Sequence, residues 1–391
     1  WIVLQVTPIV YIIWSGPEAL ATWSQFTGRF GAADGSVSLL YFGLALSTLL
    51  SLLPQIGEQA DYLRFLPPKE RIGATRWWAA MLAGGPGWTL IAGVKLVLGS
   101  YLAWFVINLD NPPADPASPT AMFHLLFTEM TAWPGFSLVL AGVFVVVCQL
   151  KINVTNAYAG SIAWSNFFSR LTHSHPGRIV WLIFNVLIAL LLMETGIFTV
   201  IEDILIMYAM VAASWIGALA ADLMISKPLR LSPAGIEFKR AHLYDLNPVG
   251  LGAMLLAIIV SVCAHLGLLG EIAQAFSPFI ALSVAFVTAP ALALATKGRF
   301  YIARRTRWPA GATQATCVMC ENTFELTDMA HCPVYSAPIC SLCCTLEARC
   351  HDRCKPDSRA TQQLSRWVAL LLPRKAAQYV HTPVGHFVFV M

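Results

Sequence analysis

Residues 203–225 read DILIMYAMVAASWIGALAADLMI, and this stretch decides the class of fold. Between Asp203 and Asp222 it carries no charged side chain. A helix needs about 20 apolar residues to cross the hydrocarbon core of a bilayer, which is about 30 Å thick. The stretch therefore predicts a membrane-spanning helix.

Seven further windows have the same character. Charged residues make up 12% and hydrophobic residues 57% of the 391 residues, whereas a soluble domain carries about 25% charged residues. This composition excludes a soluble globular protein and predicts an all-α transmembrane domain over residues 1–305. The eight predicted spans, of which the first is truncated, cover residues 1–15, 37–60, 83–107, 136–167, 179–200, 203–225, 248–269 and 272–296.

The loops between these spans alternate in charge. Arg and Lys collect in residues 64–76, 170–178, 227–240 and 297–307, whereas Arg29 is alone in the first intervening loop and residues 108–133 hold no cation. The positive-inside rule places the cation-rich loops in the cytoplasm. We therefore predict a multi-pass protein of a bacterial inner membrane, in contact with lipid and not with nucleic acid.

Both ends of the sequence lie in apolar stretches, because the chain opens on Trp1 and stops within His386–Met391. We expect a fragment of a longer protein. Residues 359–391 are predicted to form an amphipathic linker and the start of a further membrane segment.

Two predicted spans carry polar residues at membrane depth. In the first, Pro54 and Gly57 are expected to break the helix beside Ser51 and Gln55, and a broken helix in a membrane needs a polar cavity for its freed backbone groups. A simple proline kink is the alternative interpretation. Ser51 and Gln55 are therefore candidate ligand-binding residues.

The second polar segment lies near the middle of the long span 136–167. Lys151 there would cost several kcal/mol unless it is paired or faces water. Asn153, Asn156 and Gly160 recur at helical spacing and share a face, with Thr155 beside them. We predict a binding face, and the alternative is a polar contact between helices that only stabilises the bundle.

These segments resemble the purine–cytosine permease family of nucleobase–cation symporters over roughly residues 1–305. The segment Gly217–Asp222, a basic loop and Asn247–Leu251 are similar to the end of the family's tenth helix and the start of its eleventh. Asp61–Phe65 is similar to the end of helix six, and Thr155–Ser161 is similar to part of helix eight.

The resemblance implies that the eight spans are helices five to twelve of a twelve-helix, five-plus-five inverted-repeat fold of the LeuT type. It also implies that Asn156 binds a nucleobase, with further contacts around Ser51 to Gln55. Lys151 lies near the place of the family's sodium ion, so we hypothesise that its ammonium replaces that cation.

Eight of the ten cysteines fall between residues 317 and 354, after the last predicted span. Two C-x2-C pairs, Cys317–Cys320 and Cys340–Cys343, lie about twenty residues apart, a spacing typical of tetrahedral thiolate sites. Disulfides are rare in the cytoplasm, and so small a module needs metal for its folding energy. We predict a metal-binding module over residues 306–358 with the candidate ligands Cys317, Cys320, Cys332, Cys340, Cys343, Cys344, Cys350 and Cys354.

Eight thiolates suffice for two zinc ions, or for an iron–sulfur cluster with thiols to spare. Zinc is preferred because nothing in the sequence demands redox chemistry, and a reduced thiol-rich linker is the remaining alternative. Cys148 and Cys263 lie in predicted helices and are interpreted as packing residues.

A permease-like domain followed by a cytoplasmic module resembles the membrane part of bacterial sensor histidine kinases. This analogy predicts an input domain that binds a nucleobase-type molecule and signals to a downstream region in the same chain. A nucleobase transporter with a metal-binding tail is the alternative, and a scaffold that recruits a partner is the third hypothesis. The sequence contains no pattern of catalytic residues.

Overall fold

The computed structural model describes residues 2–26, 38–55, 57, 59, 63, 65–108, 118–172, 176–195, 201–347, 350–355 and 359–371. The described residues are mostly helical. The chain divides into two compact units, one formed by Trp1–Phe42 with Pro54–Gly160 and the other by Gly43–Leu53 with Ser161–Met391.

Five helices among the described residues are long and apolar enough to cross a membrane, and each coincides with a predicted span. They indicate a membrane protein. The other three predicted spans contain the shorter helices α1 (Ile2–Ser15), α3 (Leu39–Leu50) and α10 (Arg178–Glu194). The twelve-helix inverted repeat stays a prediction. The five spanning segments are Leu90–Ile107, Pro134–Ser169, Ile204–Ser226, Pro248–His265 and Ser277–Ala295.

The first unit has a core of aromatic side chains from α7 (Trp88–Ile107), α8 (Pro119–Met130) and the first part of α9 (Pro134–Thr172). The ring centroids of Phe127 and Phe144 lie 6.3 Å apart in an edge-to-face arrangement, a spacing at which aromatic pairs add about 1 kcal/mol to area burial. The other helices of this unit, besides α1, are α2 (Glu18–Trp23), α5 (Lys69–Ile72) and α6 (Ala74–Gly84).

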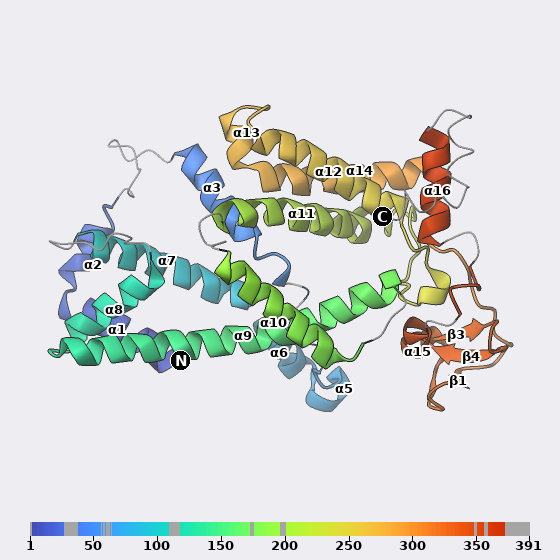
Figure 1. Cartoon of the computed structure of the whole chain (residues 1–391), viewed down its shortest axis with the longest axis horizontal. Coiled ribbons are helices and arrows are strands. Elements are labelled where there is room, and N and C mark those ends of the chain that lie inside the picture. Colours follow the sequence, from blue (N-terminus) through green and yellow to red (C-terminus); the bar gives the residue numbers. More distant parts are fainter. Residues whose placement is uncertain are drawn as a thin grey trace. The chain divides into compact units, whose positions relative to one another are not determined.

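The second unit contains three helices that lie side by side, α11 (Ile201–Ala221), α12 (Pro248–His265) and α14 (Ser277–Ala295) (Figure 1). Small residues let them approach closely, as in other membrane bundles. A Cβ atom on Gly217 of α11 would lie 2.5 Å from the carbonyl oxygen of Leu282 on α14. Buried alanines such as Ala253 and Ala285 continue the contact. Ser47 of α3 donates a hydrogen bond of 2.6 Å to the carbonyl of Ala275, the last residue of α13 (Glu271–Ala275).

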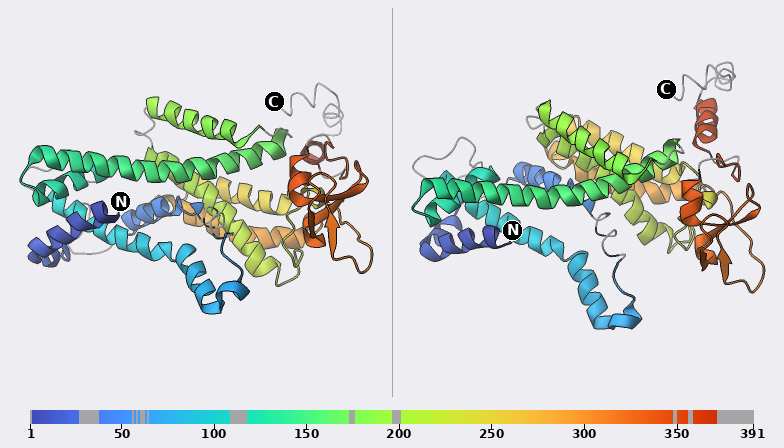
Figure 2. Two further views of the ribbon diagram at one scale, coloured as in Figure 1. Left: turned by 90° about the horizontal axis from the view of Figure 1, so that it is seen from below. Right: turned by 60° about the horizontal axis from the view of Figure 1, so that its bottom comes forward.

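A cysteine module lies at one end of these three helices (Figures 1 and 2). It contains two antiparallel hairpins, which the sequence analysis did not predict. The first pairs β1 (Gln314–Thr316) with β2 (Thr323–Glu325), and the second pairs β3 (Met329–Cys332) with β4 (Ala337–Cys340). The short helices η4 (Leu326–Asp328) and α15 (Ser341–Leu346) complete the module, and α16 (Ala360–Leu371) follows it.

Candidate metal centre

Four cysteines of the module converge on one point. The sulfur atoms of Cys317, Cys320, Cys340 and Cys343 all lie within 4.8 Å of one another. Cys317 and Cys340 are buried, whereas Cys320 and Cys343 are partly exposed. These are the two C-x2-C pairs of the sequence analysis, so the predicted convergence of these pairs is confirmed.

Local backbone structure explains why the two pairs meet. Cys317 and Cys320 occupy the turn between β1 and β2, where the Cys317 N–H donates to the Asn322 carbonyl at 2.9 Å. Cys340 ends β4, and Cys343 lies in the first turn of α15. A bond of 2.9 Å from the Val318 N–H to the Pro338 carbonyl joins the two hairpins. Each pair is thus held by its own turn, and this bond brings the turns together.

Backbone N–H groups point at two of the sulfur atoms. The Cys340 N–H donates to Cys317 Sγ at 3.3 Å, and the Cys343 N–H donates to Cys340 Sγ at 3.4 Å. Burial alone would raise the pKa of Cys317, but the N–H groups of Cys340, Cys320 and Met319 lower that pKa to about 6. Hydrogen bonds to the charged form have this effect. The centre is therefore arranged to hold a thiolate.

Two of the other thiols, Cys340 and Cys343, resist ionisation. Burial, and then the neighbouring cysteines, raise the pKa of Cys343, and burial also raises the pKa of Cys340. Four sulfur atoms in one place cannot all carry negative charge unless a cation lies between them. The donor set fits a metal ion, because sites made of four cysteine thiolates are a common form of structural zinc centre.

The spacing of the sulfur atoms also fits. Cys320 Sγ and Cys340 Sγ lie 4.0 Å apart. A tetrahedral ion with metal–sulfur bonds of about 2.3 Å places its ligands about 3.8 Å from one another. A disulfide would need about 2.05 Å, and all ten cysteines are free thiols in this structure.

Zinc binding at neutral pH should release at least the protons of Cys340 and Cys343, whose pKa values are raised, whereas Cys317 is already largely ionised. Because bound thiolates do not take protons, the release of two or more protons makes the apparent zinc affinity rise at least about 100-fold per pH unit. Isothermal titration calorimetry in buffers of different ionisation enthalpy counts the released protons. An affinity that does not change with pH near neutrality would contradict this expectation.

The module is fastened to the loop between α11 and α12. Arg240, in η3 (Arg240–His242), donates to both carboxylate oxygens of Asp352, and its shortest bond is 2.7 Å. The two side chains are only 5% and 6% exposed. Arg240 also donates to the carbonyl of Ser169 at the end of α9, at 3.3 Å. One guanidinium therefore joins the loop, a membrane helix and the module.

Further contacts strengthen the same attachment. Lys239 Nζ donates to the Thr327 carbonyl at 2.6 Å, and Lys355 Nζ pairs with Asp245 at 2.6 Å. Gln363 of α16 exchanges two hydrogen bonds with the backbone of Leu246, at 3.0 and 2.9 Å. Both the module and α16 are thus connected to the residues that lead into α12.

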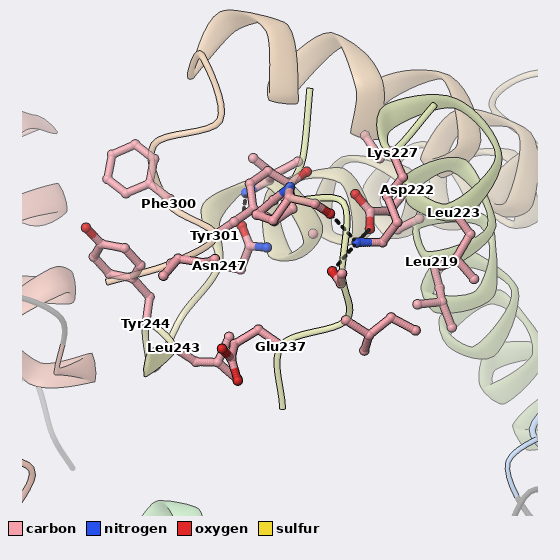
Figure 3. Close-up of a pocket in the computed structure, with 18 of the residues that line it drawn as sticks. Leu219, Asp222, Leu223, Lys227, Glu237, Leu243, Tyr244, Asn247, Phe300 and Tyr301 are labelled. Carbon is pink, nitrogen blue, oxygen red and sulfur yellow. Dashed lines mark hydrogen bonds and ion pairs between the residues drawn. The ribbon is translucent and has the colours of Figure 1, made fainter. Parts of the chain in front are cut away.

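A cavity of about 560 Å³ lies at the end of α11 that faces this loop (Figure 3). The π-helix η2 (Asp222–Ser226) ends α11 here. Lys227 Nζ donates to the carbonyls of Pro233 and Gly235 at 2.7 and 2.8 Å and lies 3.7 Å from Asp222. Burial, and then the Asp222 carboxylate, raise the pKa of Tyr301. Through its hydrogen bonds to the carbonyls of Pro233 and Gly235, Lys227 holds the α11–α12 loop against the end of α11.

The predicted ligand residues of α9 are not enclosed by their own unit. Asn153, Thr155 and Asn156 are exposed, as is Lys151, and Gly160 is half-buried. The hydroxyl of Thr155 donates to the Ile152 carbonyl of the same helix at 2.9 Å. Their role in ligand binding stays a prediction.

The other predicted ligand segment begins where α3 ends. α3 stops at Leu50, and residues 51–54 form turns, in agreement with the helix break expected at Pro54. Ser51 is buried and donates to the Thr48 carbonyl at 2.6 Å, and Gln55 is half-buried. Asp61 and most of its motif lie outside the described residues, as do residues 372–391 with the predicted further membrane segment.

The ion pair that fastens the module is not predictable from sequence patterns. Lys239 and Arg240 indicate only the orientation of their loop, and no sequence pattern gives Asp352 a role. Arg240 and Asp352 are 112 positions apart. The available signal was the position of two charged residues, Asp352 and Arg353, between Cys350 and Cys354.

Comparison with known protein families, curated proteins and solved structures finds no match to this chain.

Proposed function

We propose that this chain is the membrane input domain of a signalling protein, and that a zinc-organised cytoplasmic module couples its membrane helices to the region that follows. The observation that carries the proposal is the attachment of the module and α16 to the α11–α12 loop through Arg240, Lys355 and Gln363. A shift of α11 against α12 would displace this loop and, with it, α16.

The buried ion pair favours a module that is coupled to the membrane helices over a flexible tail that only follows them. A linker that only follows a transporter needs no fixed geometry, whereas here a bidentate pair and two backbone hydrogen bonds fix it. Bidentate Arg–carboxylate pairs are geometrically specific. A histidine kinase region is the signalling partner that the resemblance implies.

Zinc is the ion proposed for the metal centre. Its preference for four tetrahedral thiolates suits the geometry of Cys317, Cys320, Cys340 and Cys343. An iron–sulfur cluster is the alternative, and it would colour the purified protein brown and release sulfide on acidification. Zinc without sulfide in the purified chain is the expected result.

The proposed ligand is a nucleobase-type molecule, on the strength of the resemblance alone. Vesicles that contain the full chain are expected to bind tritiated cytosine or hypoxanthine without accumulating it. Accumulation would favour the alternative function, a nucleobase transporter with a metal-binding tail. Absence of both binding and accumulation would remove the nucleobase from the proposal.

Replacing Asn156 with alanine tests the binding face. Loss of one amide that pairs with the ligand costs about 1–3 kcal/mol, which is roughly a 5- to 150-fold weaker affinity for the tritiated nucleobase. Asn166→Ala is the matched control, because Asn166 is an exposed asparagine on the same helix. Equal binding by both variants would exclude Asn156 from the site.

A further inference from the structure

We propose a second metal site in the module, formed by Cys332, Cys344, Cys350 and Cys354. All four cysteines line one small cavity, apart from the first centre. The two carboxylates that also line it have other partners, because Asp352 binds Arg240 and Glu347 accepts a hydrogen bond of 2.7 Å from the Tyr335 hydroxyl. The thiols are therefore the donors that remain for an ion, and four thiolates are a zinc-type ligand set.

The register of the second hairpin separates the two sites. In the pairing of β3 with β4, Met329 lies opposite Cys340 and Cys332 lies opposite Ala337. Three residues of strand, about 10 Å, thus separate the ends that carry Cys340 and Cys332. Cys343 and Cys344 are consecutive in α15 and point about 100° apart, so that one serves each site. The eight cysteines form two interleaved sets.

The second site is less closed than the first. Within the described residues, no three of its sulfur atoms lie within 4.8 Å of one another. Cys350 and Cys354 flank a turn in which His351 and Asp352 have φ angles of 45° and 51°, values that residues other than glycine seldom adopt. Binding of an ion would draw this turn inward and fix its backbone.

The turn carries Asp352, the partner of Arg240. Occupancy of the second site and attachment of the module to the α11–α12 loop are therefore linked, so that each strengthens the other. This regulatory consequence rests on the proposed input function, whereas the metal site itself does not. The ligand class is a single divalent ion of the zinc type.

Metal content of the full chain, purified in detergent and measured by mass spectrometry, tests the site. The expected result is two zinc ions per chain, and one after Cys344→Ser, which leaves the first centre intact. Cys263→Ser, on α12 and outside the module, should retain both. One ion in the unmodified chain, or two in Cys344→Ser, would overturn the proposal.

A more conservative variant distinguishes loss of the second metal site from misfolding of the module. Cys354→His retains a zinc ligand, so this variant should bind two cobalt ions, one with a four-sulfur spectrum and one with a three-sulfur, one-nitrogen spectrum. An unchanged four-sulfur spectrum overturns the second site. A different result would contradict the proposed input function. In that case α16 would not respond to ligand although the chain still holds both ions.

Discussion

We expect a chain in which Cys340 is replaced by serine to keep its membrane helices but to lose the folded structure of its cysteine module. The core of the module is small and consists mainly of Cys317, Met329, Ala330, Ile339 and Cys340. So few buried residues cannot offset the conformational entropy of a module of this size. Structural zinc supplies about 10–16 kcal/mol of apparent folding free energy in small domains, and a site with three thiolates loses much of it.

Hydrogen exchange measured by mass spectrometry checks this expectation segment by segment. Peptides from residues 306–347 should exchange rapidly in Cys340→Ser, and a strong chelator should have the same effect on the unmodified chain. Peptides from α11, α12 and α14 should stay protected, because those helices have their own core of small residues. Cys263→Ser is the matched control, and a module that stays protected in Cys340→Ser would show that metal does not hold it together.

The membrane character was predictable because hydrophobic length is a local property. Residues 203–225 need only their own composition to specify a span, and the structure places a helix there. Helix ends were less predictable. The expected span 179–200 contains α10 only to Glu194, whereas the end of α3 at Leu50, inside the span 37–60, agrees with the break expected at Pro54.

The metal centre was predictable only in part. A C-x2-C pair forms a turn of its own, so the sequence identified Cys317 with Cys320 and Cys340 with Cys343 as partners in one site by their spacing alone. The assignment of the other four cysteines to a separate second site depends on the β3–β4 register and on the adjacent positions of Cys343 and Cys344. Register is set by packing and turn geometry, and spacing does not encode it.

Replacing Arg240 with alanine is expected to release the module from the α11–α12 loop while the module stays folded. The substitution leaves Asp352, 6% exposed, as a buried carboxylate without its cation. Breaking a buried pair in this way costs about 3–5 kcal/mol, more than the pair itself contributes. The bond from Arg240 to the Ser169 carbonyl is lost as well. Distances between spin labels on α12 and α16 should therefore broaden from one population to several.

The double variant Arg240→Met with Asp352→Leu tests whether attachment of the module needs the two charges or only the packing contact between the two side chains. Apolar side chains of similar volume often replace a buried ion pair at little cost, so this variant should restore a single distance although neither charge is present. Arg299→Ala, at an exposed position after α14, should leave the distances unchanged. If Arg240→Ala behaves like Arg299→Ala, the ion pair does not fasten the module. If the double variant docks but α16 no longer responds to ligand, the charge pair carries the signal in addition to the attachment.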